Sequence, residues 1–111
     1  MELYEQIEKL SQELTSSIKL LRKNGEAFAE AEREYKISLA QKSLELRDGG
    51  MAITLIDKVV FGDRHVAEMR FKRDVANATY EANKEHINVT KLQLRLLEGQ
   101  LSREWGNADK E

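Results

Sequence analysis

Apolar residues recur at steps of three and four along the first 46 residues, and this spacing constrains the fold more than any other sequence feature. The residues that share it are Leu3, Ile7, Leu10, Leu14, Ile18, Leu21, Phe28, Tyr35, Leu39 and Leu46. Sustained three-four spacing is typical of a coiled-coil seam. The chain has no proline, the strongest helix breaker. The pattern predicts one helix over residues 3–47, with thinner packing or a bend where Gly25 and Glu32 fall on the seam.

The segment 48–62 is predicted to be a bend that contains a short helix. Gly49 and Gly50 favour an end to the first helix, because glycine adopts the left-handed conformation past a helix end at little cost. Thr54 and Asp57 have the spacing of a helix-capping pair, which predicts a short apolar helix over residues 55–61. Asp63 is then expected to cap the next helix.

That next helix is predicted over residues 64–105, followed by a frayed tail at 106–111. Two long helices joined by a compact bend form an antiparallel hairpin. We therefore expect an all-α, coiled-coil-like hairpin with a short helix at the bend. A chain of 111 residues supports a single domain, here residues 1–111.

The second helix carries apolar residues on two opposite sides. A helical wheel places one set together: Val66, Met69, Ala76, Tyr80, Ile87, Leu94 and Leu101. The opposite set is Phe71, Val75, Ala78, Ala82, Val89, Leu92 and Leu96. The first helix offers a single apolar stripe, so it can cover only one of these sets.

We expect the set from Phe71 to Leu96 to be the uncovered one, and it predicts association. Large exposed apolar patches usually mark interaction sites, and a lone hairpin of this size buries little surface. The simplest outcome is a homodimer in which two hairpins form a four-helix bundle. Two alternatives are a different protein partner and a monomer in which the short helix folds back over Phe71 and Val75.

Composition restricts the function class further. The chain has no cysteine, a net charge of −2 and no apolar run long enough to span a membrane, so we expect a cytoplasmic protein without disulfides. A basic run provides the alternative function, an accessory nucleic-acid-binding factor. Its residues are Arg64, Arg70, Lys72 and Arg73, with Asp63 and Asp74 as balancing charges.

The sequence predicts neither a catalytic nor a metal site. His65 and His86 are about 30 Å apart along one helix, whereas metal sites need three or four convergent ligands. No phosphate-binding loop or catalytic constellation is present in the sequence, so no enzyme activity, metal or cofactor is expected. Trp105 should pack over the open end of the hairpin near Leu3, Tyr4 and Ile7; the alternative is an exposed recognition tryptophan.

The order of segments resembles small proteins encoded by phages and prophages of Gram-positive bacteria. The similar features are AEREY in the first helix, TLI and GD around the bend, and INVTKLQ with REW near the end, within residues 20–106. The resemblance implies a location in the cytoplasm of a bacterial host cell. The expected function is a non-enzymatic, self-associating interaction module, a phage factor that binds and modulates a host protein such as a defence component.

Overall fold

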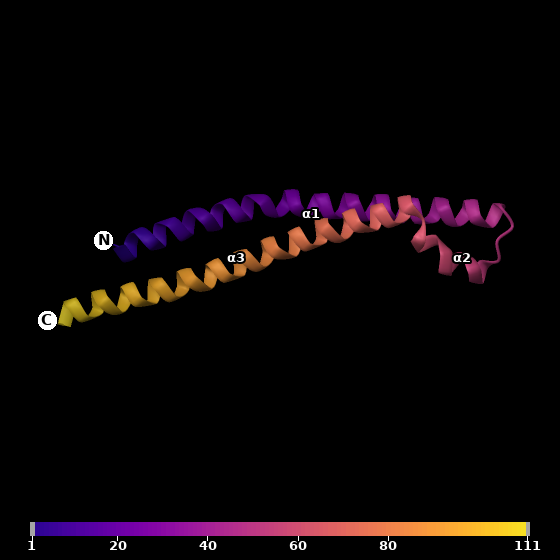
Figure 1. Cartoon of the computed structure of the whole chain (residues 1–111). Coiled ribbons are helices and arrows are strands. Elements are labelled where there is room, and N and C mark those ends of the chain that lie inside the picture. Colours follow the sequence, from indigo (N-terminus) through magenta and orange to yellow (C-terminus); the bar gives the residue numbers. More distant parts are fainter. Residues whose placement is uncertain (1, 111) are drawn as a thin grey trace. The chain divides into compact units, whose positions relative to one another are not determined.

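The chain is all-helical, as the sequence predicts. The computed structural model describes the backbone of residues 2–110 and the side chains of residues 2–106. Its elements are α1 (Glu2–Asp48), α2 (Ile53–Val59), the 3-10 helix η1 (Val60–Gly62) and α3 (Arg64–Lys110) (Figure 1). The chain divides into two compact units, which share the long helices. Unit 1 contains Met1–Lys23 and Glu81–Glu111, and unit 2 is Asn24–Tyr80.

In unit 2, α1 ends at the predicted glycines. Gly50 has a φ of 90°, the left-handed region that glycine enters without a steric penalty. The Met51 N–H donates to the Leu46 carbonyl oxygen at 3.1 Å, and the Gly50 N–H donates to the Arg47 carbonyl oxygen at 3.0 Å. These two bonds form a Schellman motif, which satisfies carbonyl groups that the end of the helix leaves unpaired.

The short helix begins earlier than the sequence predicts. Its N-cap is Ala52, which makes no side-chain capping bond, so the predicted cap formed by Thr54 and Asp57 is wrong. The Ala52 backbone carbonyl accepts the N–H groups of Leu55 and Ile56 instead, each at 3.0 Å. The Schellman motif anchors Met51, and α2 begins two residues later without a side-chain cap.

The Asp63 cap of α3 is confirmed. Its Oδ2 accepts the Val66 N–H at 3.1 Å, and its Oδ1 lies 3.6 Å from the Lys42 Nζ. The hydrogen bond from Val66, and then the Lys42 charge, lower the pKa of the Asp63 carboxyl below its usual value of 3.8 despite partial desolvation. The same residue therefore starts α3 and connects it to α1 within unit 2.

The core of unit 2 needs all three of its segments. Ile56 and Val60 from α2 and η1 pack with Tyr35 of α1 and Val66 of α3, and all four side chains are buried. Partly buried side chains surround them: Leu39, Leu46, Met51 and Met69. In Figure 1, α2 lies beside the C-terminal part of α1, where it covers the end of the α1 seam. It does not cover Phe71 or Val75, which are exposed, so that alternative prediction is wrong.

The seam of unit 2 is filled at Gly25, where the sequence predicts thin packing. A Cβ at this position would lie 3.2 Å from Tyr80 Cε1, so the glycine makes room for the tyrosine ring. The ring also packs against Phe28, with 6.2 Å between the centroids. An aromatic side chain from α3 thus replaces the side chain that Gly25 lacks.

Unit 1 is a pair of antiparallel helices with a narrower core. Its buried side chains are Ser17, Ile87, Thr90 and Leu94. Ile18, predicted on the seam, is exposed, and Ser17 takes its place because the three-four alternation continues from Leu14 through position 17 to Leu21. The Asn83 side-chain amide donates to the Ser17 carbonyl oxygen at 3.0 Å. α3 also continues as a helix through Gly106 to Lys110, where the sequence predicts a frayed tail; Glu111 lies outside the described residues.

Candidate functional site

The outward side of α3 carries a row of exposed apolar residues, here called the outer stripe. Its members are those predicted for association: Phe71, Val75 and Ala78 in unit 2, and Ala82, Val89, Leu92 and Leu96 in unit 1. All seven are exposed, and the outermost two, Phe71 and Leu96, expose 63% and 64% of their surface.

The opposite side of α3 is turned inward in both units. Every residue of that predicted set is buried or half-buried: Val66, Met69, Ala76, Tyr80, Ile87, Leu94 and Leu101. The prediction that α1 covers only one of the two sets is therefore confirmed. The outer stripe is left in water because α1 has one apolar face and α2 packs into the core of unit 2.

Charged residues interrupt and border the outer stripe. Glu85 is exposed and lies on the stripe itself, three residues after Ala82 and four before Val89. Asp74 and Arg95 lie on its border, one residue before Val75 and one before Leu96. Arg73 donates two hydrogen bonds to Asp74 Oδ1, at 2.8 and 3.0 Å. The surface is thus an apolar stripe with charges of both signs at its margin.

In unit 1 the stripe adjoins a shallow apolar groove. The groove has a volume of about 300 Å³ and is lined by Leu10, Gln93, Leu96 and Leu97. Leu96 belongs to both the stripe and the groove, so the exposed apolar surface extends from the back of α3 towards α1 at this level of unit 1.

In unit 2 the bend adds further exposed apolar residues. These are Ile53, Leu55 and Val59 of α2 and Phe61 of η1. The Arg70 guanidinium lies 5.6 Å from the centroid of the Phe61 ring, which shields part of that ring. The bend therefore buries Ile56 and Val60 and leaves their neighbours exposed.

The predicted basic run does not form one surface. Arg73 is directed into unit 2, where its guanidinium lies 4.5 Å from the centroid of the buried Tyr35 ring and bonds Asp74. Arg70 lies over Phe61. Arg64 and Lys72 are exposed, but at 100° per residue neither shares a helix face with Arg70. Nucleic-acid binding stays a prediction. The Arg73 guanidinium contacts the Tyr35 ring and Asp74.

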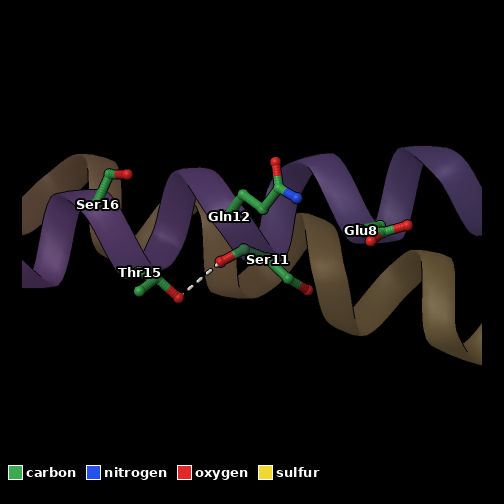
Figure 2. Close-up of a pocket in the computed structure, with 5 residues that line it drawn as sticks. All are labelled: Glu8, Ser11, Gln12, Thr15 and Ser16. Atoms are coloured by element: carbon green, nitrogen blue, oxygen red, sulfur yellow. Dashed lines mark hydrogen bonds between the residues drawn. The ribbon is translucent and has the colours of Figure 1, made fainter.

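A polar hollow lies on the outer side of α1 in unit 1 (Figure 2). It is lined by Glu8, Ser11, Gln12, Thr15 and Ser16. The Thr15 hydroxyl donates to the Ser11 backbone carbonyl at 3.0 Å, as Figure 2 shows, and the other side chains point in different directions. General acid–base chemistry requires convergent groups in a sheltered site, and this hollow has neither.

The two histidines have separate surroundings. His65 Nε2 lies 3.2 Å from the Ser38 hydroxyl in unit 2. His86 lines a hollow in unit 1 with Lys9, Glu13 and Ser17 among others. Within residues 2–106, no group of three or more histidine, cysteine, aspartate or glutamate side chains is placed to hold a metal ion.

Trp105 is exposed, with 62% of its surface accessible, and Tyr4 is exposed as well. The prediction that Trp105 packs over the open end of the hairpin is therefore wrong. α3 continues past Trp105 as a regular helix, and the indole is exposed on its last turns. The alternative, an exposed tryptophan, agrees with the structure.

Comparison with known proteins leaves the function open. Within the described part of the chain, neither long helix is sufficiently apolar over its length to cross a bilayer. No protein-family model, curated protein or solved structure matches the chain significantly.

Proposed function

We propose that this protein is a non-enzymatic interaction module that self-associates through the outer stripe of α3. The observation that supports the proposal is the exposure of all seven stripe residues on one helix side. Burial of a large apolar side chain contributes roughly 1.5–3 kcal/mol, so a stripe with five large members favours contact with another apolar surface. Two hairpins joined in this way form a dimer with four long helices.

The proposal extends to a second partner. A homodimer that covers the outer stripe leaves the polar faces and the exposed Trp105 accessible, and aromatic residues are enriched at binding hot spots. Because the sequence resembles small phage proteins, we propose that these remaining surfaces bind and modulate a host protein, such as a defence component.

Size-exclusion chromatography with light scattering over a range of concentrations tests self-association. The proposal predicts a mass near twice the 12.8 kDa of the chain. Leu92→Ser should weaken the dimer, since two leucines per dimer lose burial. At roughly 1.5–3 kcal/mol each, the dissociation constant rises at least about 100-fold.

Leu44→Ser is the matched control. Leu44 of α1 exposes 58% of its surface and Leu92 exposes 52%, but Leu44 lies off the stripe. The control should leave the dissociation constant unchanged. A monomer at all concentrations would refute self-association, and an unchanged dissociation constant for Leu92→Ser would place the interface elsewhere.

A further inference from the structure

We infer that the second copy binds the outer stripe in the antiparallel orientation, about a two-fold axis that passes between Asn83 and Lys84 of α3. This inference rests on the proposed self-association and adds the orientation and the register of the two helices. It depends only on the periodicity of α3 and on the residues that border the stripe.

The spacing of the stripe is the same from either end. With Glu85 included, its positions are Phe71, Val75, Ala78, Ala82, Glu85, Val89, Leu92 and Leu96. The steps alternate four, three, four, three, four, three and four, which is a coiled-coil spacing with a palindromic order. Two antiparallel copies can therefore align every position over about 38 Å of helix.

This alignment also matches the sizes of the side chains. Phe71 faces Leu96 of the second copy, and Val75 faces Leu92 of the second copy. Near the axis, Ala78 faces Val89 and Ala82 faces Glu85. The bulky side chains thus meet at the two ends. At the centre, each Glu85 lies beside an alanine, which leaves room for its carboxylate to reach water.

Charge complementarity supports the same register. The bordering residues that approach each other are Asp74 of one copy and Arg95 of the other, and the two-fold axis produces this pair twice. Asp74 accepts both hydrogen bonds from Arg73 on its Oδ1 atom. Arg95 forms no ion pair within residues 2–106. In the dimer, Asp74 of the second copy supplies Arg95 with a carboxylate.

The parallel orientation lacks both features. In a parallel pair each residue faces itself, so Glu85 lies opposite Glu85 of the second copy and two like charges meet in the stripe. Asp74 and Arg95 then lie about 32 Å apart along the helix axis and cannot pair. The antiparallel register offsets the two Glu85 side chains by three residues, about 4.5 Å along the axis, so that each faces Ala82 instead of the other glutamate, and it forms two opposite-charge contacts.

Disulfide formation tests the orientation, because the native chain contains no cysteine. One chain carries Phe71→Cys and the other carries Leu96→Cys, and an equimolar mixture is oxidised gently. Mass spectrometry of the linked peptides then identifies which thiols have joined. The inference predicts disulfides between the two different variants, with little linkage of either variant to itself.

The outcomes separate this inference from the proposed function. Linkage of each variant to itself, with a dimeric mass, would show parallel association and overturn the inference while self-association stands. A dimeric mass without any linkage would also overturn it, because the stripe would not be the contact. A monomeric mass for the unsubstituted chain would refute self-association itself.

Charge reversal provides a second measurement that leaves the apolar stripe intact. Asp74→Arg and Arg95→Asp should each weaken their own homodimer about tenfold, because each places like charges together at both ends. A mixture of the two variants should recover the original affinity as a heterodimer, since both contacts then join opposite charges. No recovery in the mixture would contradict the antiparallel register.

Discussion

The two units use the same pair of helices but bury apolar and polar side chains in different proportions. Unit 2 buries an apolar cluster of Tyr35, Ile56, Val60 and Val66, to which three segments contribute, and one polar side chain, Ser38. The buried residues of unit 1 are Ser17, Ile87, Thr90 and Leu94, of which two are polar. The Thr90 hydroxyl donates to the His86 carbonyl oxygen at 2.7 Å, so its hydrogen-bond partner lies within its own helix.

The difference shows what a third segment contributes. Two helices side by side can cover only a narrow seam. Small or polar residues fit such a seam without loss of packing. When α2 folds against α1 in unit 2, it encloses Val66 completely, with none of its surface exposed. A thicker core is more sensitive to the loss of volume, because fewer of its neighbours can move in.

The largest expected effect comes from truncating matched isoleucines. Ile56 of unit 2 and Ile87 of unit 1 are each 6% exposed. Ile56→Ala should lower the free energy of unfolding by about 2–5 kcal/mol, and Ile87→Ala should cost less, since the two-helix seam can close around the smaller side chain. Urea unfolding at one fixed protein concentration measures both, because association shifts apparent stability. A larger loss of unfolding free energy for Ile87→Ala than for Ile56→Ala would show that the core of unit 1 is the more sensitive of the two.

An intermediate effect is expected from two helical glycines. A Cβ at Gly99 in unit 1 meets only the flexible Arg103 Nη1, at 3.5 Å, so Gly99→Ala should raise the free energy of unfolding by about 0.5–1 kcal/mol. Gly25→Ala in unit 2 gains the same helix propensity but forces the Tyr80 ring to move, a cost of about 1–3 kcal/mol. The expected result is a net loss of stability. Thermal unfolding of both variants provides the comparison, and equal stabilisation would show that the Tyr80 ring yields freely.

The smallest effect concerns pH and belongs to unit 2. Because the pKa of Asp63 is lowered in the folded chain, the charged cap stabilises α3 above pH 3.8, and this contribution is lost as the pH falls through the lowered pKa. Amide hydrogen exchange should show declining protection of Val66 below about pH 4, with less change at Ile87 of unit 1. Asp63→Asn keeps a capping oxygen without a charge and should remove this pH dependence. An unchanged profile in that variant would assign the effect to another group.

The long-range pattern of the fold could be predicted from sequence because it depends on local repetition. The three-four spacing, the absence of proline, the glycines after Asp48 and the cap at Asp63 each act within a few residues along the chain. The two apolar sides of α3 follow from helical periodicity in the same way. Those predictions agree with the structure, including the exposure of the outer stripe.

What the sequence did not predict depends on the surroundings of particular side chains. Thr54 has the chemistry of a cap, but the Schellman motif at Met51 fixes where α2 begins. The sequence also places Arg73 in a basic run, but the Tyr35 ring that its guanidinium contacts lies on another helix and is distant in sequence. Trp105 was predicted to pack over the open end because an antiparallel hairpin places it level with Leu3, Tyr4 and Ile7, but the indole is 62% exposed.

The sequence alone thus determined that two long helices form, where α1 ends and α3 begins, and that α3 has an unmatched apolar side. Tertiary structure decided how Tyr80 fills the space at Gly25 and how α2 completes the core of unit 2. The physical reason is that helix formation responds to neighbours three and four residues away, whereas burial depends on which surfaces meet. A periodic sequence specifies helix formation, and only packing determines which residues are buried.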